Sequence, residues 1–339
     1  MPSDAGAKSR CILVVGCGSI GKRHIANLLA MKAGRILAHD TRADRRDEVA
    51  ARFGVDVVHD ITDAWRRTVN VALIAVPNNL HIPVALAAAK QGCHLFIEKP
   101  LSNSLKGVEE LIRITKDLKL TTLVGCNMRF NPGILSIKKL INEGKIGNVV
   151  AARIEVGQYL PDWHPWEDYR QGYSANQALG GGIILDAIHE IDYARWILGE
   201  IRTVACFAAR LSHLEIDTED TAAITVRFDN GAIGEIHMDY VQRAASRSCK
   251  IIGDQGTIIW DNSVDEVRWF SARTNVWQVL PYPPGWQLNQ MYLDEMQHFI
   301  NCIKGREESA LVVNEATQVL KIALAAKESA LTGRTIDIG

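Results

Sequence analysis

The 339-residue sequence lacks the features that mark several classes of protein. No apolar run approaches the roughly 20 residues that a membrane span needs. The formal net charge is only −1, which leaves no basic field for nucleic acid and no polybasic patch for a membrane surface. The first ten residues are small and polar without an apolar core segment, so we interpret them as a loose leader rather than a signal peptide.

Paired cysteines are also missing. The seven cysteines lie far apart, in or beside apolar segments, and none forms a C-x-x-C; they are Cys11, Cys17, Cys93, Cys126, Cys206, Cys249 and Cys302. An odd, scattered set of this kind indicates reduced thiols and a cytoplasmic protein rather than a disulfide framework.

The composition that remains is that of a globular protein, with 47% hydrophobic and 23% charged residues. The chain is too long for one ordinary core. We predict an α/β protein of two domains, an N-terminal Rossmann domain with a doubly wound parallel sheet over residues 1–125 and a C-terminal α+β domain over 126–339. The second domain should bind substrate and form oligomers through an open, mainly antiparallel sheet.

A glycine motif opens the first domain. The apolar run 11–15 leads directly into Gly16-Cys17-Gly18-Ser19-Ile20-Gly21, and a helical pattern follows. In this strand–loop–helix context, Gly16 allows a tight turn and Gly18 lets the backbone approach a pyrophosphate. Gly21 lets the helix and strand pack closely, with the anion at the helix N-terminus beside Ser19 and Ile20.

Asp40 strengthens this interpretation, because it ends the second apolar run, 35–39, at 19 residues after Gly21. An acid at that distance holds the ribose 2′-OH of NAD and repels a 2′-phosphate. Three arginines just downstream, Arg42, Arg45 and Arg46, leave NADP open, although such a cluster is more often the solvated face of a helix start. NAD is the favoured cofactor.

Two further apolar runs end in polar residues. Residues 71–76 lead into Pro77-Asn78, with His81 at the start of the next helix, and residues 94–98 end in Glu98-Lys99-Pro100. Ligands of open α/β sheets bind outside the carboxyl ends of the strands. We therefore expect these residues beside the cofactor; they are Pro77, Asn78, His81, Glu98 and Lys99. The alternative for Glu98 and Lys99 is a solvated ion pair at a strand end.

The second half changes to period-two alternation of apolar and polar residues. Residues 222–228 and 233–240 are joined through Asp229-Asn230-Gly231, a strong hairpin signal. Several long antiparallel strands with few helices predict a sheet that helices cover on one face. A second subunit is the economical cover for the other face, giving a homodimer or homotetramer. Glu235, His237 and Asp239 share a strand face, and we interpret them as interface or surface residues rather than metal ligands.

A second chemical signal follows the glycines 180–182. Asp186, His189 and Asp192 recur every three residues, so on one helix they share a face. A histidine flanked by carboxylates is a good general base, since the acids hold the ring and stabilise imidazolium. The alternative is an Asp at a helix N-terminus together with a core histidine.

The sequence resembles the Gfo/Idh/MocA family, named after glucose–fructose oxidoreductase, inositol dehydrogenase and rhizopine catabolism. The resemblance covers nearly the whole chain, and Glu98-Lys99-Pro100 is its most specific short motif. The other matching segments are Gly16 to Gly21, Val76-Pro77-Asn78, Asn127-Met128-Arg129-Phe130 and the helix from the three glycines to Asp192.

The resemblance implies NAD(P)-dependent oxidation of a sugar or cyclitol hydroxyl, or the reverse reduction, with Lys99 and His189 as the catalytic pair. His189 would remove the hydroxyl proton while hydride leaves for the nicotinamide, and Lys99 would stabilise the developing alkoxide. The usual family spacing is Asp-x-x-x-His, but Leu185 occupies that place here and Asp186 stands three before His189. Asp186 and Asp192 are therefore both candidates to support the base.

Substrate recognition is predicted for an aromatic and charged segment, 158–170, after the first long strand of the second domain. Aromatic faces stack on sugar rings, so Trp163, His164, Trp166 and Tyr169 are candidates; the alternative is an arm at a subunit contact. The segment resembles a family branch of bacterial surface-sugar biosynthesis, including nonulosonic acids. Arg129 either binds a phosphate or carboxylate of the substrate or stabilises the domain junction.

Two other functions stay open. Some family members act as non-catalytic NAD-sensing regulators, although a sensor needs neither Lys99 nor His189. Others use NAD transiently for elimination or glycoside cleavage. We expect no metal, no nucleic acid and no membrane among the partners.

Overall fold

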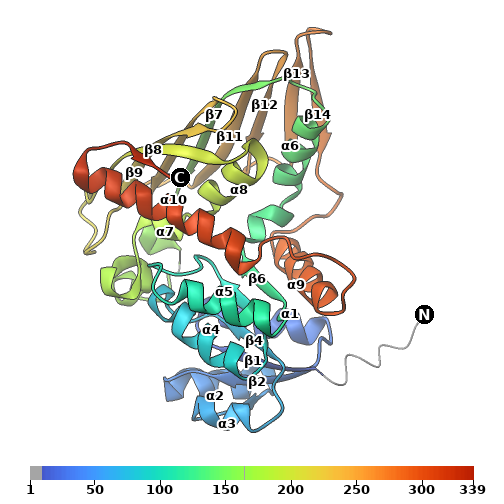
Figure 1. Cartoon of the computed structure of the whole chain (residues 1–339), viewed down its shortest axis with the longest axis vertical. Coiled ribbons are helices and arrows are strands. Elements are labelled where there is room, and N and C mark those ends of the chain that lie inside the picture. The colour runs from blue at the N-terminus through green and yellow to red at the C-terminus, as the bar shows by residue number, and fades with distance from the viewer. Residues whose placement is uncertain (1–9, 164) are drawn as a thin grey trace. The chain divides into compact units, whose positions relative to one another are not determined.

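The computed structural model describes residues 10–163 and 165–339, so His164 and the first nine residues lie outside it. The chain divides into two compact units, 1–127 with 288–317 and 128–287 with 318–339 (Figure 1). The sequence predicted a single boundary after residue 125. The difference is the segment 288–317, which lies inside the predicted second domain in sequence but groups with the first unit.

Hydrogen bonds explain this grouping. Asn289 and Asn27 exchange amide hydrogen bonds, and the Ser309 hydroxyl donates to the carbonyl of Thr122. The backbone N–H of Val124 donates to the carbonyl of Leu311, along the strand that ends the parallel sheet. The segment thus covers that edge, which satisfies backbone groups that an edge strand leaves unpaired.

The described part of the first unit contains a six-stranded parallel sheet in the order β3-β2-β1-β4-β5-β6. Its strands are β1 (Cys11–Val15), β2 (Arg35–His39), β3 (Asp56–Val57), β4 (Val71–Ile74), β5 (His94–Glu98) and β6 (Thr122–Gly125). Its helices are α1 (Ser19–Ala30), α2 (Ala43–Phe53), α3 (Ile61–Trp65), α4 (His81–Lys90), α5 (Val108–Asp117) and α9 (Asn289–Ile303). This is the predicted doubly wound fold.

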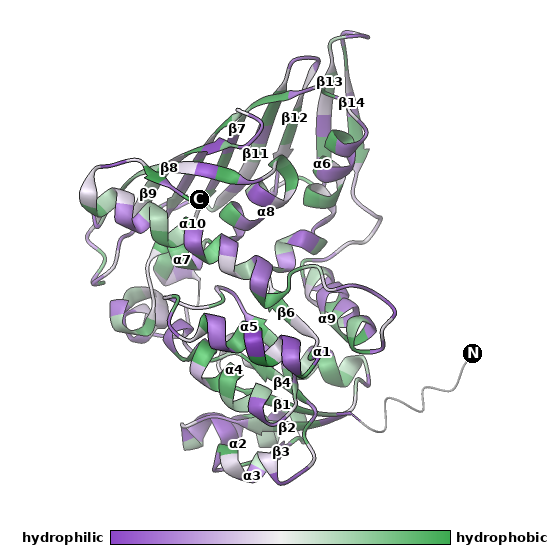
Figure 2. Ribbon diagram, viewed as in Figure 1, coloured by the Kyte–Doolittle hydropathy of each residue, from purple (hydrophilic) through white to green (hydrophobic). Residues whose placement is uncertain are grey.

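The pattern of apolar residues determines which elements of this unit are buried and which lie at the surface. Every residue of β1 and β4 is buried, as expected for parallel strands covered on both faces. The helix α2 lies at the surface: it buries only Val49, and Figure 2 shows it as largely hydrophilic beside the apolar strands. Strand order reverses between β1 and β4, which makes their carboxyl ends the expected ligand crevice.

The described part of the second unit contains a nine-stranded sheet in the order β14-β13-β12-β11-β7-β10-β9-β8-β15. Its strands are β7 (Val149–Gly157), β8 (Ile201–Ala209), β9 (Thr221–Phe228), β10 (Ile233–Asp239), β11 (Ser246–Gly253), β12 (Gly256–Asp261), β13 (Glu266–Ser271), β14 (Val276–Pro281) and β15 (Ile336–Asp337). The predicted hairpin joins β9 and β10, and the sheet is antiparallel except where β7 pairs with β10.

Helices cover one face of this sheet. They are α6 (Pro132–Asn142), α7 (Ile183–Asp186), α8 (His189–Leu198) and α10 (Val313–Thr332), with the unit boundary at Thr317 inside α10. α6 begins as its sequence predicts, because Pro132 occupies the first turn and the Asn131 side chain accepts from the N–H groups of Gly133 and Ile134. Along β9 buried and exposed residues alternate, so the sheet has one covered and one open face.

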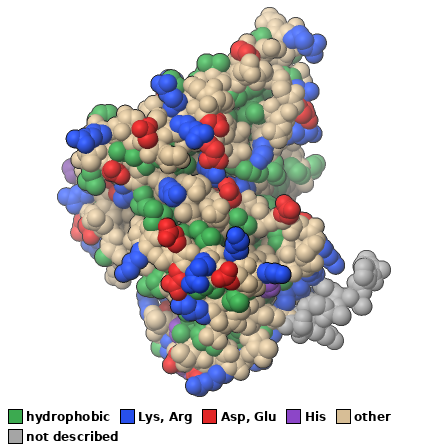
Figure 3. All heavy atoms as spheres, in the orientation of Figure 1, with side chains coloured by type: hydrophobic (Ala, Val, Ile, Leu, Met, Phe, Trp, Pro, Cys, Tyr) green, Lys and Arg blue, Asp and Glu red, His purple; other side chains and the backbone are tan. Residues whose placement is uncertain are grey.

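Two surface findings concern partners. On the face drawn in Figure 3, the Lys and Arg side chains of the described residues lie among Asp and Glu rather than in a field of one sign. No helix in residues 10–163 or 165–339 is long and apolar enough to cross a membrane.

Candidate functional site

The glycine loop between β1 and α1 has the geometry that its motif predicts. Gly16 has a φ of +99°, and a Cβ there would lie 2.3 Å from the carbonyl oxygen of Ala75. A Cβ on Gly21 would lie 1.9 Å from the carbonyl oxygen of Gly16, so helix and strand pack at backbone contact. Beside Gly18, by contrast, the nearest atom is 3.6 Å away, on Arg45. Gly18 is therefore the open glycine, and it precedes a helix N-terminus without a side-chain cap among the described residues.

Asp40 follows β2 and points its buried carboxylate at this loop. It accepts hydrogen bonds from the backbone N–H groups of Cys17 (2.8 Å) and Arg42 (2.9 Å). The guanidinium of Arg42 pairs with Asp44, and that of Arg46 donates to the backbone carbonyls of Asp40 and Thr41. A fixed carboxylate beside the open glycine fits NAD, because it accepts from ribose hydroxyls and repels a 2′-phosphate.

The end of β4 continues into the short 3₁₀ turn Asn78–Leu80, with Pro77 before it and Asn78 buried. His81 begins α4 and is also buried. Its Nδ1 lies 2.7 Å from the carbonyl oxygen of Pro100, and its Nε2 lies 2.8 Å from that of Val76. Burial lowers the pKa of His81. A neutral imidazole has one N–H, so His81 donates to one of these two carbonyls and lies against the other, between the segments after β4 and β5. Its contact with the cofactor stays a prediction.

Glu98 is the last residue of β5. It is buried, and it pairs with a histidine that the sequence analysis did not predict as its partner. Its Oε1 lies 2.5 Å from Nε2 of His24, on α1, and its Oε2 accepts from the backbone N–H of Lys99. Lys99 itself is half-buried, and the Lys99–Pro100 peptide bond is cis. The solvated ion pair that was the alternative for Glu98 is therefore wrong, since its carboxylate is held inside the unit.

The three glycines of the second unit allow a close approach of chain segments. A Cβ on Gly181 would lie 2.2 Å from the carbonyl oxygen of Tyr173, and one on Gly182 would lie 2.4 Å from the carboxylate of Glu219. The one helix predicted after them is wrong. The chain forms α7, breaks at residues 187–188, and restarts as α8 with His189 as its first residue.

Asp186, the last residue of α7, is a buried acceptor for hydroxyl groups. Ser174, Tyr173 and Tyr240 donate to its carboxylate at 2.5, 2.6 and 2.9 Å. Burial and the charge of Asp186 raise the pKa of Tyr240 well above its usual value, which keeps that phenol a donor. Asp186 therefore ties α7 to the preceding loop and to the end of β10.

Asp192 has a different partner. Arg129 donates from Nε to Oδ2 (2.8 Å) and from Nη2 to Oδ1 (2.7 Å), and both side chains are buried. The guanidinium also lies 5.0 Å from the ring centroid of Trp196. For Arg129 this geometry adds a structural role inside the second unit, where the pair joins residue 129 to α8. The two roles predicted for Arg129, an anion site for substrate and stabilisation of the domain junction, stay predictions. For Asp192 it adds a structural role in fixing α8.

The aromatic segment divides into held and exposed residues. Trp163 packs edge-on against Tyr240, with ring centroids 5.4 Å apart, and the hydroxyl of Tyr169 accepts from the backbone N–H of Glu215. Trp166 is 71% exposed, and the predicted candidate His164 lies outside the described residues. Of this set, Trp166 presents the most open aromatic face.

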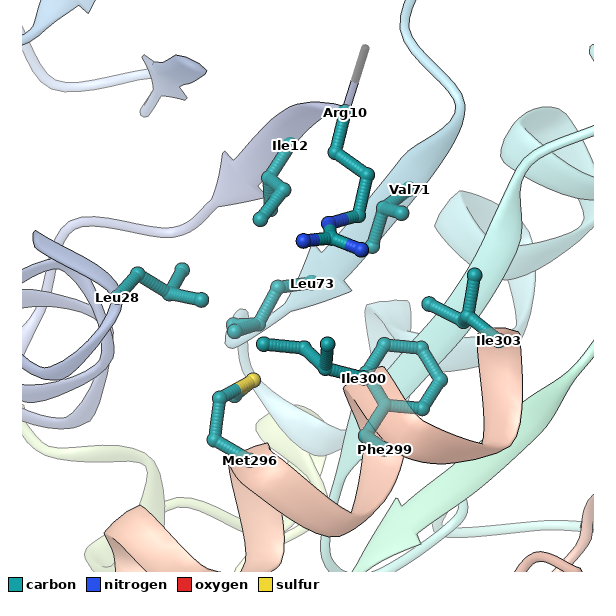
Figure 4. Close-up of a pocket in the computed structure, with 9 residues that line it drawn as sticks. All are labelled: Arg10, Ile12, Leu28, Val71, Leu73, Met296, Phe299, Ile300 and Ile303. Atoms are coloured by element: carbon teal, nitrogen blue, oxygen red, sulfur yellow. The ribbon is translucent and has the colours of Figure 1, made fainter. Parts of the chain in front are cut away.

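The described residues enclose one small cavity in the first unit and a wider hollow in the second, and none of the predicted site residues lines either of them. A small apolar cavity of about 10 Å³ lies between α9 and the starts of β1 and β4 (Figure 4). It is at the amino ends of the strands and has space for about one water molecule. On the open face of the second sheet a hollow of about 500 Å³ lies over Arg153, Glu235, His237 and Lys250. In the described part of the chain no three His, Cys, Asp or Glu side chains are grouped to hold a metal ion.

The sequence analysis missed His24 and Tyr240. His24 lies on the inner face of α1 with Gly21, Ile25 and Leu28, so its helical spacing was a usable signal for a buried polar group. Tyr240 directly follows β10, and its partner Asp186 is 54 residues away, so no local pattern identifies the pair.

Comparisons with known proteins agree with this geometry. The model of an oxidoreductase family with an NAD-binding Rossmann fold matches residues 10–126, and that of the GFO/IDH/MocA C-terminal domain matches residues 134–259. A myo-inositol 2-dehydrogenase of Thermotoga maritima is 30% identical, over 96% of this chain and 97% of the relative. The NAD⁺-dependent scyllo-inositol 2-dehydrogenase of Bacillus subtilis is 25% identical, over 97% and 96%.

Solved structures show the same fold. A levoglucosan dehydrogenase in complex with NADH matches with a TM-score of 0.88 at 24% identity, over 97% of this chain and 99% of that one. The open glycine and the fixed carboxylate of Asp40 give this chain the groups that NAD requires. The chain therefore belongs to the Gfo/Idh/MocA family, and it is an NAD-dependent dehydrogenase or reductase.

Proposed function

We propose that the protein transfers a hydride between a secondary hydroxyl of a sugar or cyclitol and NAD, with Lys99 and His189 as the catalytic pair. The observation that carries the proposal is the position of Lys99 directly after β5, at the carboxyl edge of the sheet that holds the glycine loop and Asp40. The relatives add support, because those compared above are inositol and levoglucosan dehydrogenases.

The chemistry assigns a separate task to each residue. NAD, when bound, accepts the hydride from the carbinol carbon. The hydroxyl must lose its proton in the same process, and the neutral imidazole of His189 accepts it. The ammonium of Lys99 donates a hydrogen bond to the same oxygen, which stabilises negative charge there as the proton leaves. In the reverse direction, the imidazolium returns the proton to the carbonyl oxygen.

Asp186 and Asp192 support the base in this proposal without touching substrate. The hydroxyls on Asp186 fix the end of α7, and the pair of Asp192 with Arg129 fixes the first turns of α8. His189 begins α8 between these two anchors and is buried, so the backbone from which its imidazole extends is held on both sides. Trp166, the exposed aromatic residue of the segment 158–170, is the candidate to stack on a sugar ring.

The test is a substrate panel with two readouts. The protein is incubated with NAD and myo-inositol, scyllo-inositol, levoglucosan or nucleotide-linked sugars, while NADH absorbance and carbohydrate products are followed together. Net NADH in equal amount to ketone product is expected. Product without NADH would show the redox-neutral alternative. NAD binding with no product from any compound would contradict the proposal and favour the regulator.

We also propose that a second copy of the chain covers the open face of the nine-stranded sheet. Large apolar side chains are exposed there, with Phe207 85%, Trp277 47% and Val279 52% exposed. Strand register places them on the same face as Arg153 and Glu235, which form an ion pair. Sedimentation should give a dimer or tetramer, and Trp277→Glu should lower that mass. A monomeric wild-type protein would contradict this.

A further inference from the structure

The buried pair of His24 and Glu98 serves no step of the reaction proposed above, yet it joins two segments of the cofactor domain. His24 lies on α1, the helix that begins at the glycine loop, and it is 0% exposed. Glu98 ends β5, one residue before Lys99. Their contact, 2.5 Å between Nε2 and Oε1, therefore connects the helix of the glycine motif to the strand that presents the lysine.

The second carboxylate oxygen extends this connection. Oε2 of Glu98 accepts from the backbone N–H of Lys99 at 3.2 Å. With the ring proton on Nε2, His24 donates to Oε1, so one carboxylate is held at both oxygens. The peptide unit from which the Lys99 side chain extends is thereby fixed relative to α1.

Aromatic rings enclose the histidine. The rings of Phe96 and Tyr292 approach it edge-on, with centroids at 5.1 and 6.3 Å. Its other nitrogen, Nδ1, is buried without a hydrogen-bond partner among the described residues. A buried polar atom without a partner lowers stability, and a leucine would fill such a place without that loss. Packing alone therefore does not explain a histidine at this position. The hydrogen bond that its Nε2 can donate to Glu98 does.

We propose that His24 is a positioning residue, which holds Glu98 and through it the backbone of Lys99. This rests on the proposed catalytic role of Lys99. His24 touches neither substrate nor the reacting atoms; it fixes where the lysine side chain starts. A displacement of about 1 Å at a catalytic group reduces turnover by up to about a hundredfold, which sets the size of the expected effect.

Substitutions of His24 test the proposal in the NAD-loaded enzyme. His24→Leu removes the donor, whereas His24→Gln places an amide N–H near the position of Nε2. We expect kcat with the best panel compound to fall about ten- to a hundredfold in His24→Leu and to stay near the wild-type value in His24→Gln. KM and the Kd of NADH should change little, because the glycine loop and Asp40 are untouched.

The matched control is His94→Asn. His94 begins β5, and its Nδ1 accepts only from the backbone N–H of Thr121 among the described contacts. This variant removes a partly buried ring from the same strand at the end away from Lys99. It should lower thermal stability without lowering kcat. If His94→Asn and His24→Leu reduce kcat equally, the effect is general destabilisation and the proposal is overturned.

A spectroscopic readout needs no substrate. Lysines of the NAD-loaded protein are reductively methylated with ¹³C-formaldehyde, and the Lys99 signal is identified by its loss in Lys99→Arg. That signal should move in His24→Leu and remain in place in His24→Gln and His94→Asn. An unmoved signal in His24→Leu would refute the positioning role.

The outcomes distinguish the positioning role of His24 from the catalytic role of Lys99, on which it rests. If Lys99→Met retains turnover, the catalytic role of the lysine is wrong, whatever the His24 variants do. If Lys99→Met is inactive while His24→Leu turns over normally, Lys99 remains catalytic and only the role of His24 is wrong.

Discussion

Replacing Arg129 by methionine removes one half of a buried ion pair. Its two hydrogen bonds to Asp192 are 2.8 and 2.7 Å long, and the side chains are 6% and 0% exposed. Without the guanidinium, the carboxylate of Asp192 stays buried without its cation. Loss of one partner from such a pair costs about 3–5 kcal/mol of unfolding free energy. Asp192→Asn should cost a similar amount by leaving the guanidinium uncompensated.

Thermal unfolding of the second unit measures this loss. For a domain of this size, about 1 kcal/mol corresponds to about 2–4 °C in Tm, so a fall of about 6–20 °C is expected for either variant. The circular dichroism of the whole chain follows this unfolding; Trp196, which contacts the guanidinium, is one of eight tryptophans, so fluorescence reports it only together with the others. The double variant Arg129→Met/Asp192→Asn should lose clearly less than the sum of the two, since residues in contact are coupled.

The same variants distinguish the two roles predicted for Arg129. If Arg129→Met keeps the wild-type Tm but raises KM for a carboxylate- or phosphate-bearing sugar, the arginine binds substrate and the structural interpretation is refuted. If stability falls and KM for neutral cyclitols is unchanged in the fraction that stays folded, the pair fixes α8 as proposed.

Three other predictions concern single groups. Asp40→Ala should raise KM for NAD and reduce the preference for NAD over NADP, because the carboxylate that repels a 2′-phosphate is gone; equal preference in the wild type would contradict this. Asp186→Asn should lower Tm, since one amide cannot accept from three hydroxyls, but should leave the pH profile of kcat/KM unchanged; a shifted profile would make Asp186 part of the base. Burial lowers the pKa of His81 below 6.5, so its unfolded form binds protons more readily. Unfolding free energy should therefore fall as pH drops below about 6.5, and this loss should be smaller in His81→Gln, where His94, whose pKa burial also lowers, still contributes.

Much of the first unit was predictable because its signals are local. A continuous apolar run marks β1, and the glycine motif stands at its end. The hairpin between β9 and β10 was predictable for the same reason, since Asn230-Gly231 encodes the turn within a few residues. The helix after the glycine motif, α1, followed from the spacing of its apolar residues.

The parts that were missed depend on distant partners. Segment 288–317 joins the first unit through hydrogen bonds to Asn27 and Thr122, and no pattern in the sequence of the segment indicates these partners. Asp186 and Asp192 have the spacing of one helical face, but Tyr240 and Arg129 hold them in separate places. The three-residue repeat drew attention to these residues, while their hydrogen-bond partners could be found only in the folded chain.

The most direct test of the account compares wild type, Lys99→Met and His189→Asn with the panel compound that gives the fastest NADH formation. NADH binding, followed by its fluorescence, should be the same in all three proteins. Turnover should fall by at least about a hundredfold in each variant, the size of effect expected for a lost acid–base or charge-stabilising group. Wild-type turnover in either variant, with NADH bound normally, would contradict the claim that these two residues carry the reaction.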